Sequence, residues 1–239
     1  MIARTCVAAR AALVLLACTT SAAAVGQPGQ TAPAIPATEL AAASTDSRRC
    51  ELHVWGGERF QAHSSGLLGG MGLLGGLIDG AMHARENREN VGRLGGALDT
   101  QGQVAALAAV DLPAALNLPN HVVVQHDEPM DPARANRNQG RHAASASPCY
   151  AELMVTRLLY QRTPIYGRTL RASFLYRDFG NAARPAFTFA GRGGNGLRLF
   201  PAREESQIEA ANAELVDVYK ANFSEYVRNL LSRRNQRRR

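Results

Sequence analysis

The sequence predicts an α/β (α+β) fold: a mixed, largely antiparallel sheet with a long hairpin, packed by helices that include a long C-terminal helix. Two long strand-like runs, 150–161 and 168–179, flank a short turn-forming segment. An apolar stripe at helical spacing extends over 204–231. We therefore expect one domain over residues 49–231, which follows a signal (1–18) and a tether (19–48) and precedes a basic tail (232–239).

The first strand of this domain is expected at 50–55, with a second short strand at 58–63. Cys50 opens the first strand-like run, and Cys149 directly precedes the first strand of the hairpin. An exported chain with two cysteines in its body most simply forms one bridge. We therefore expect a Cys50–Cys149 disulfide between two strand ends that lie side by side.

A glycine-rich apolar segment follows at 66–82. Gly72, Gly76 and Gly80 recur every four residues, so on a helix they would form a stripe of small residues that permits close backbone approach. The segment resembles the glycine zippers of bacterial envelope proteins, which implies membrane insertion or self-association. The other interpretation is a flexible or tightly packed hairpin within the fold, because each glycine costs a helix about 1 kcal/mol relative to alanine.

Helices and one strand are expected between this segment and the hairpin. Residues 84–96 are charged and predict a helix, and Asp99 is expected to cap another helix that ends at 107–110. Asp111 with Pro113 predicts the start of a further turn. The apolar run 121–126 predicts a buried strand, and the polar segment 127–148 predicts a mobile loop.

The second strand of the hairpin alternates between apolar and polar residues, which predicts a half-buried antiparallel strand. Its apolar face is expected to carry Leu170, Ala172, Phe174 and Tyr176. Two more short strands are expected at 186–190 and 197–200.

The closing helix at 204–231 has an apolar stripe that runs from Ile208 to Leu230. Glu204 and Glu205 lie near its positive end and arginines near its negative end, as the helix dipole favours.

Residues 1–18 have the layout of a secretory signal, with two arginines before an apolar run at 11–17 that is too short to span a bilayer. The ending Leu15-Leu16-Ala17-Cys18 resembles a bacterial lipobox, which implies lipidation of Cys18 and attachment to a membrane. The alternative is ordinary cleavage near the small residues at 22–24. We expect an exported lipoprotein that faces the periplasm and is anchored in the outer membrane, with residues 19–48 as a mobile tether.

The formal net charge of +7 is concentrated at the two ends of the chain. Of 27 basic residues, two lie in the signal and six at the C-terminal end, which leaves 19 against 20 acidic residues. The C-terminal arginines are expected to bind anionic lipid head groups or other acidic polymers of the envelope, or else to form a solvated helix end. These are Arg233, Arg234, Arg237, Arg238 and Arg239. We expect this tail to be dispensable for folding, and we expect no nucleic-acid binding because no aromatic residues are interleaved with it.

None of the chemical motifs in the sequence has the context that its chemistry needs. Residues 191–196 match G-x-G-x-x-G, but an extended run follows instead of a helix, so we expect a flexible hairpin loop and no cofactor. His121, His126, Asp127 and His142 are of metal-ligating types, yet the two strand histidines are five residues apart and should face opposite sides, so no metal is expected. The chain also has no G-x-S-x-G motif.

The order of expected elements is strand, helices, strand, long hairpin, short strands and closing helix. This order resembles the small mixed-sheet domains of envelope lipoproteins such as the TolB N-terminal and CsgG-like group, and it implies no site residues. We expect a non-enzymatic lipoprotein that binds or scaffolds other envelope proteins. The alternatives are a membrane-active or oligomerising protein that uses 66–82, and an envelope hydrolase; the sequence leaves the oligomeric state open.

Overall fold

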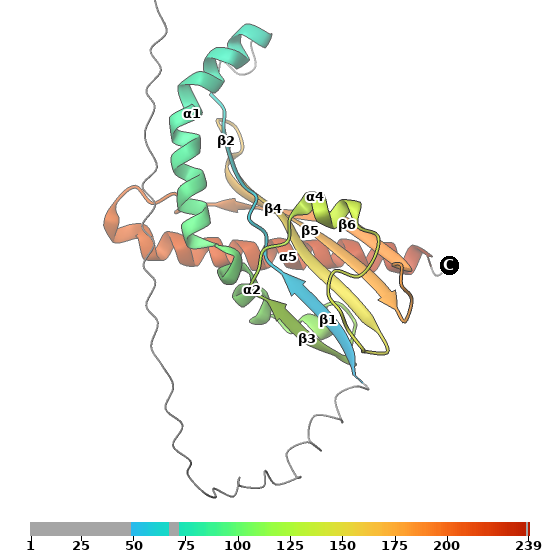
Figure 1. Ribbon diagram of the computed structural model, residues 1–239. Helices are drawn as coiled ribbons and strands as arrows, with labels where there is room; N and C mark the ends of the chain where they lie inside the picture. The colour runs from blue at the N-terminus through green and yellow to red at the C-terminus, as the bar shows by residue number, and fades with distance from the viewer. Residues whose placement is uncertain (1–48, 67–71, 238) are drawn as a thin grey trace, which may run out of the picture.

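The computed structural model of the chain describes residues 49–66, 72–237 and 239 (Figure 1). The predicted signal, the lipidation site Cys18 and the tether lie outside these residues. Lipidation and export therefore stay predictions.

In the described part of the chain, six strands form one mixed sheet in the order β3-β1-β4-β5-β6, with β2 paired to β4. The strands are β1 Cys50–Trp55, β2 Phe60–Ser64, β3 His121–His126, β4 Tyr150–Thr163, β5 Gly167–Gly180 and β6 Phe187–Leu197. The long β4–β5 hairpin and the β5–β6 pair are antiparallel, whereas β1 pairs in parallel with β3 and β4, and β2 in parallel with β4. The predicted fold class is confirmed, and the strands before the hairpin supply its parallel part.

The strands β1 and β2 lie one after the other along the same edge of β4. β1 pairs with 150–154 and β2 with 158–162. Between the two strands the chain leaves the sheet at Gly56 and Gly57, opposite a register shift between Val155 and Arg157 in the β4–β5 ladder. A Cβ atom on Gly57 would lie 2.5 Å from the carbonyl oxygen of Val155, so this close crossing requires glycine.

Helices cover both faces of the sheet. They are α1 Gly72–Ala97, α2 Thr100–Ala108, α3 Leu112–Ala115, α4 Pro132–Arg137 and α5 Ile208–Arg237, with a short 3-10 turn η4 at Glu205–Gln207. Figure 1 shows α5 crossing one face of the sheet, α1 running beside β2, and α4 on the face opposite α5. The predicted caps are confirmed: the Asp99 side chain accepts the Gly102 N–H at 2.7 Å, and Asp111 accepts the Ala114 N–H at 3.1 Å.

The main core lies between α5 and the sheet. The predicted apolar face of β5 is buried there, and so is most of the predicted stripe of α5. The aromatic rings of Phe174 and Tyr226 lie 5.1 Å apart, and those of Phe174 and Phe223 lie 5.4 Å apart. These aromatic side chains supply large buried apolar areas, which is the main source of stability at this interface.

Of the two alternatives for the glycine-rich segment, the structure has the helix and not the hairpin over residues 72–82. Gly72, Gly76 and Gly80 lie in the first turns of α1, which continues without a break through the predicted helix 84–96. No helix within the described ranges is long and apolar enough to cross a membrane. The use of this segment in self-association stays a prediction.

The G-x-G-x-x-G segment is also not the expected hairpin loop, because residues 191–196 lie inside β6 and pair with β5. β6 covers the first predicted strand from residue 187 onward, but it ends at Leu197, so residues 198–200 of the second predicted strand lie outside it. The physical reason is the close approach of α5: a Cβ atom on Gly193 would overlap the backbone of Asn222, and one on Gly191 would crowd Phe189 and Tyr226. Glycine here serves helix–sheet packing, so its low strand propensity misled the prediction.

Two expectations about the segment before the hairpin were also wrong. β3 is a half-buried edge strand instead of a buried one, because only β1 pairs with it. Residues 127–148 contain α4 and pack on the sheet, where Met130 and Ala135 form a second, small core with Trp55, Met154 and Leu175.

Candidate functional site

The structure joins Cys50 and Cys149 in a disulfide with a Cα–Cα distance of 4.6 Å. The two cysteines lie at the starts of β1 and β4, which are parallel neighbours, and the N–H of Glu51 donates to the carbonyl of Cys149. The bridge therefore ties the first strand of the fold to the start of the hairpin.

The C-terminal arginines do not form a separate tail, because α5 continues to Arg237. Arg234 donates to the carbonyl of Leu116 at 3.0 Å, and its guanidinium lies over the ring of Tyr176 at 5.2 Å. Arg237 lies over Phe187 at 5.6 Å. Arg233 and Arg239 are exposed, and Arg238 lies outside the described residues. The expected solvated tail is thus partly packed against the fold. Its deletion should therefore reduce stability, instead of leaving folding unaffected.

The histidines that were considered as metal ligands are separated by the fold. His121 lies at the start of β3, beside Cys50, and His126 lies at its end. The ring of His126 stacks on Trp55 at 4.2 Å and shares a hydrogen bond of 2.8 Å with His53. His53 continues the chain of contacts to the carboxylate of Glu51 at 3.0 Å. These contacts place His126 in a hydrogen-bonded side-chain network.

A second part of this network surrounds Glu152, which is fully buried on β4. Its carboxylate accepts hydrogen bonds from the Tyr150 hydroxyl at 2.8 Å and from the backbone N–H of His142 at 2.7 Å. The ring of His142 contacts it at 3.1 Å, and Arg177 lies 3.9 Å away. The guanidinium of Arg177 in turn donates to the carbonyls of Ala135 and Asn138. The network therefore fastens α4 and the segment after it to the sheet.

The pKa shifts in this network follow from burial and from its hydrogen bonds. Burial opposes ionisation of Glu51, but hydrogen bonds from Ser145 and His53 outweigh it and hold its pKa below the ordinary value. Burial, followed by the nearby charge of His53, lowers the pKa of His126. A polar hollow of about 480 Å³ opens beside His126 and His142. This region has the side chains of an acid–base site, yet most of their hydrogen bonds are made to one another and to the backbone, where they stabilise the fold.

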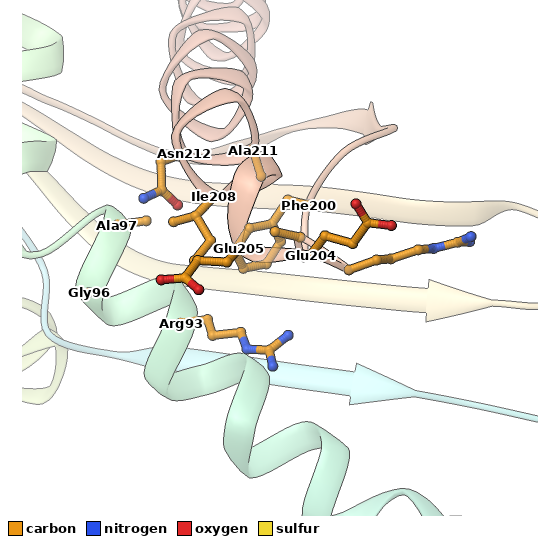
Figure 2. A pocket seen from close by; sticks show the side chains of 11 residues that line it. Arg93, Gly96, Ala97, Phe200, Glu204, Glu205, Ile208, Ala211 and Asn212 are labelled. Carbon is orange, nitrogen blue, oxygen red and sulfur yellow. The ribbon is translucent and has the colours of Figure 1, made fainter.

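A different groove lies between the end of α1, the connector after β6 and the start of α5 (Figure 2). Figure 2 shows Arg93 and Ala97 approaching from α1 and Ile208 and Asn212 from α5, with Phe200 between them. Its volume is about 460 Å³. The Ile208 side chain is 48% exposed although it belongs to the apolar stripe of α5. We call this the apolar groove.

The apolar groove adjoins a basic pocket of about 380 Å³, because Arg93, Ala202 and Arg203 line both. The lining residues of the basic pocket in the described chain are Arg93, Tyr160, Arg162, Arg168, Pro201, Ala202 and Arg203, with no Asp or Glu. Four guanidinium groups thus come from α1, β4, β5 and the connector before α5. We call this the arginine pocket.

The arginines of this pocket differ in how they are used. Arg162 pairs with Glu86 at 2.7 Å, and Arg168 donates to the backbone carbonyls of Arg198 and Phe200, which neutralise no charge. In the described residues, the side chains of Arg93 and Arg203 make no hydrogen bond or ion pair. The pocket therefore holds three positive charges without a carboxylate partner.

Tyr160 adds a buried hydroxyl to this pocket. The side chain is fully buried, and its hydroxyl has no hydrogen-bond partner in the described part of the chain. Burial raises its pKa, and the nearby Arg168 and Arg162 oppose that rise only in part, so the phenol is a neutral donor at pH 7. A buried, unpartnered hydroxyl costs about 1–3 kcal/mol.

No sequence signal identifies the arginine pocket, because its residues come from four separated segments and form no spaced motif. No protein-family model matches the chain, and the search of curated proteins finds no match. Among solved structures, the chain is similar to the hypothetical protein CT253 from Chlamydia trachomatis, with 9% identity and a TM-score of 0.33 over 76% of this chain and 95% of that chain.

Proposed function

We propose that this protein is a non-enzymatic binding protein of the cell envelope whose ligand is an anionic amphiphile, a molecule with an acidic head group and an apolar chain. The single observation that supports this most strongly is the junction of the arginine pocket with the apolar groove through shared residues. One ligand can occupy both only if it combines the two chemistries.

The acidic head group belongs in the arginine pocket. Arginine presents a planar fork of donors that matches phosphate and carboxylate oxygens in two-point contacts, and such charged hydrogen bonds are about twice as strong as neutral ones. The guanidinium groups of Arg93 and Arg203 are available for these contacts. Glu204 and Glu205 line only the apolar groove, so their charges favour placing the head group away from the start of α5.

The apolar chain belongs in the apolar groove. Ile208 is half-exposed there, beside the ring of the buried Phe200. Covering apolar surface contributes about 25 cal/mol for each Å² removed from water. The residues that line the two cavities include no serine, cysteine or histidine, and we therefore propose binding instead of covalent catalysis. Acidic lipids are abundant at the membrane-anchored location that the first eighteen residues predict, which supports the match.

Calorimetric titration with decyl phosphate, below its micelle-forming concentration, tests this proposal. The full chain with Cys18→Ser is used, which removes the predicted acylation site. We expect decyl phosphate to bind at least about tenfold more tightly than decanol, which lacks the charge, and than inorganic phosphate, which lacks the chain. Equal binding of decanol would contradict a role for the arginines, and equal binding of phosphate would contradict a role for the apolar groove.

Variants locate the binding. The double substitution Arg93→Gln and Arg203→Gln should weaken decyl phosphate binding at least about tenfold, because it removes two unpaired cations. Arg192→Gln serves as the matched control, since Arg192 is an exposed arginine of β6 outside the groove. Tyr160→Phe should cause no loss of stability, because the hydroxyl that it removes is buried and unpartnered. Unchanged binding by the double variant would overturn the proposal.

A further inference from the structure

Three side chains of metal-ligating types lie together at the end of the sheet where β1, β3 and β4 begin. Cys50 starts β1, His121 starts β3 and pairs directly with Cys50, and Cys149 precedes β4. The two sulfur atoms and a ring nitrogen of His121 all lie within 4.8 Å of one another. In the described part of the chain, no other group of three His, Cys, Asp or Glu side chains lies close enough to hold an ion. The spacing of these residues along the sequence does not reveal this set, because only the parallel pairing of β1 with β3 and β4 brings them together.

The environment of His121 supports a ligand role. Its Nδ1 atom is buried and has no hydrogen-bond partner within the residues that the structure describes. A hollow of about 410 Å³ borders the set and is lined by Arg49, Cys50, Pro119, Asn120, His121 and Val122. Cys50 and His121 therefore border open space, where a water molecule or another ligand can complete a coordination shell.

The chemistry depends on the oxidation state of the two cysteines. As a disulfide they cannot supply thiolates, and the set binds no ion through sulfur. A dithiol reductant delivers two electrons: the S–S bond breaks, two thiols form, and the reductant leaves as its own disulfide. A thiophilic ion then displaces the two thiol protons, which pass to solvent.

We propose that the reduced protein binds a thiophilic d¹⁰ cation, Cu(I) or Zn(II), through Cys50, Cys149 and His121. Two thiolates and one imidazole match the preference of such ions for soft sulfur and nitrogen donors. Around a tetrahedral ion with bonds of about 2.3 Å, ligand atoms are separated by about 3.7 Å, so the three donors already lie within reach of one centre. The two cysteines can then either form the disulfide or bind the metal ion, but not both at once.

Metal titration of the reduced protein tests the proposal, with Cys6→Ser and Cys18→Ser in the full chain to remove the other thiols. Cu(I) is titrated in competition with bathocuproine disulfonate, and Zn(II) in competition with a colorimetric zinc chelator. We expect one equivalent of at least one ion in the reduced protein and none in the oxidised protein. His121→Ala and the size-conserving His121→Gln should each weaken binding at least tenfold, whereas His63→Ala, which changes an exposed histidine of β2, should not.

Three results would overturn the proposal. One is that neither ion binds to the reduced protein, and another is that the His121 variants bind as the unmodified protein does. The third is loss of the sheet signal in circular dichroism on reduction, since the site needs β1, β3 and β4 in register.

Discussion

The buried carboxylate of Glu152 shows how one residue organises a face of the sheet. Its partners are the Tyr150 hydroxyl, the backbone N–H and the ring Nδ1 of His142, and the guanidinium of Arg177. Residues 127–148 looked mobile in the sequence because they are polar and irregular. Their attachment includes the hydrogen bonds of this buried acid near the start of β4, whose partners are up to 25 residues away in sequence.

Glu152→Gln should therefore destabilise the protein although it conserves the shape of the side chain. It removes the charge that compensates Arg177, and breaking a buried pair costs about 3–5 kcal/mol. Urea unfolding measures the change, and Glu58→Gln, at an exposed position, should change the free energy of unfolding by less than about 0.5 kcal/mol. If both variants changed the free energy of unfolding by the same small amount, the Glu152 network would not contribute to stability.

The His53–His126 pair should make stability depend on pH. His126 Nε2 and His53 Nδ1 share one hydrogen bond, and protonation of His126 at Nε2 removes its ability to accept from His53. The pKa of His126 is lowered from its ordinary value of 6.5 in the folded protein, so its contribution is present above that pH and is lost as the pH falls. Glu51, whose pKa is also lowered, adds a further loss below pH 4.5.

We expect the free energy of unfolding to be smaller at pH 5.5 than at pH 7.5, and His126→Gln to reduce this difference. Urea melts at the two pH values give the measurement. His63→Gln is the control, because this exposed histidine lies outside the network. A pH difference that His126→Gln leaves unchanged would rule out His126 as its source.

At the scale of elements, the contact between β6 and α5 explains why a glycine-rich sequence forms a strand. Gly193 lets the backbone of α5 approach at Asn222, whose side chain also donates to the carbonyl of Leu170 and accepts a hydrogen bond from Asn195. Strand propensity alone could not reveal this, because the reason for the glycines is a helix nearly thirty residues further along the chain.

Gly193→Ala should destabilise the protein by about 3 kcal/mol, because the added methyl group overlaps backbone atoms that cannot move without shifting α5. Gly196→Ala in the same strand is the matched control. Its Cβ atom would meet nothing closer than 3.9 Å, so it should be neutral or slightly stabilising. Thermal melts of the two variants compare them directly, and equal effects would mean that α5 adapts freely.

The C-terminal end of α5 is packed on the fold, so we no longer expect all of its arginines to be dispensable for stability. Arg234→Ala removes a hydrogen bond to Leu116 and a cation–π contact with Tyr176, and we expect a loss of about 1–2 kcal/mol. Arg233→Ala at the neighbouring exposed position should change stability by less than about 0.5 kcal/mol. Urea melts decide between them, and two equally neutral variants would restore the view of a wholly solvated tail.

At the scale of the whole molecule, the sequence was sufficient for the elements whose signals are local. The β4–β5 hairpin, the capped helices and the stripe of α5 follow from periodicity and capping residues, and the structure has them close to the expected bounds. The neighbouring position of β1 and β4 follows from the expected Cys50–Cys149 disulfide, which the structure contains, but the pairing of β1 with β3 was not predictable, because pairing is settled by packing over long sequence separations. The arginine pocket and the apolar groove were not predictable for the same reason, since the fold alone assembles them.

At this scale, we propose that an anionic amphiphile lies with its head in the arginine pocket and its chain in the apolar groove. Photocrosslinking with an alkyl phosphate that carries a diazirine at the end of its chain tests this most directly, with the adducts located by peptide mass spectrometry. We expect adducts on the peptides that contain Ala97, Phe200 and Ile208, and their loss in the Arg93→Gln, Arg203→Gln double variant. Adducts concentrated at 228–239, or beside His126, would contradict it.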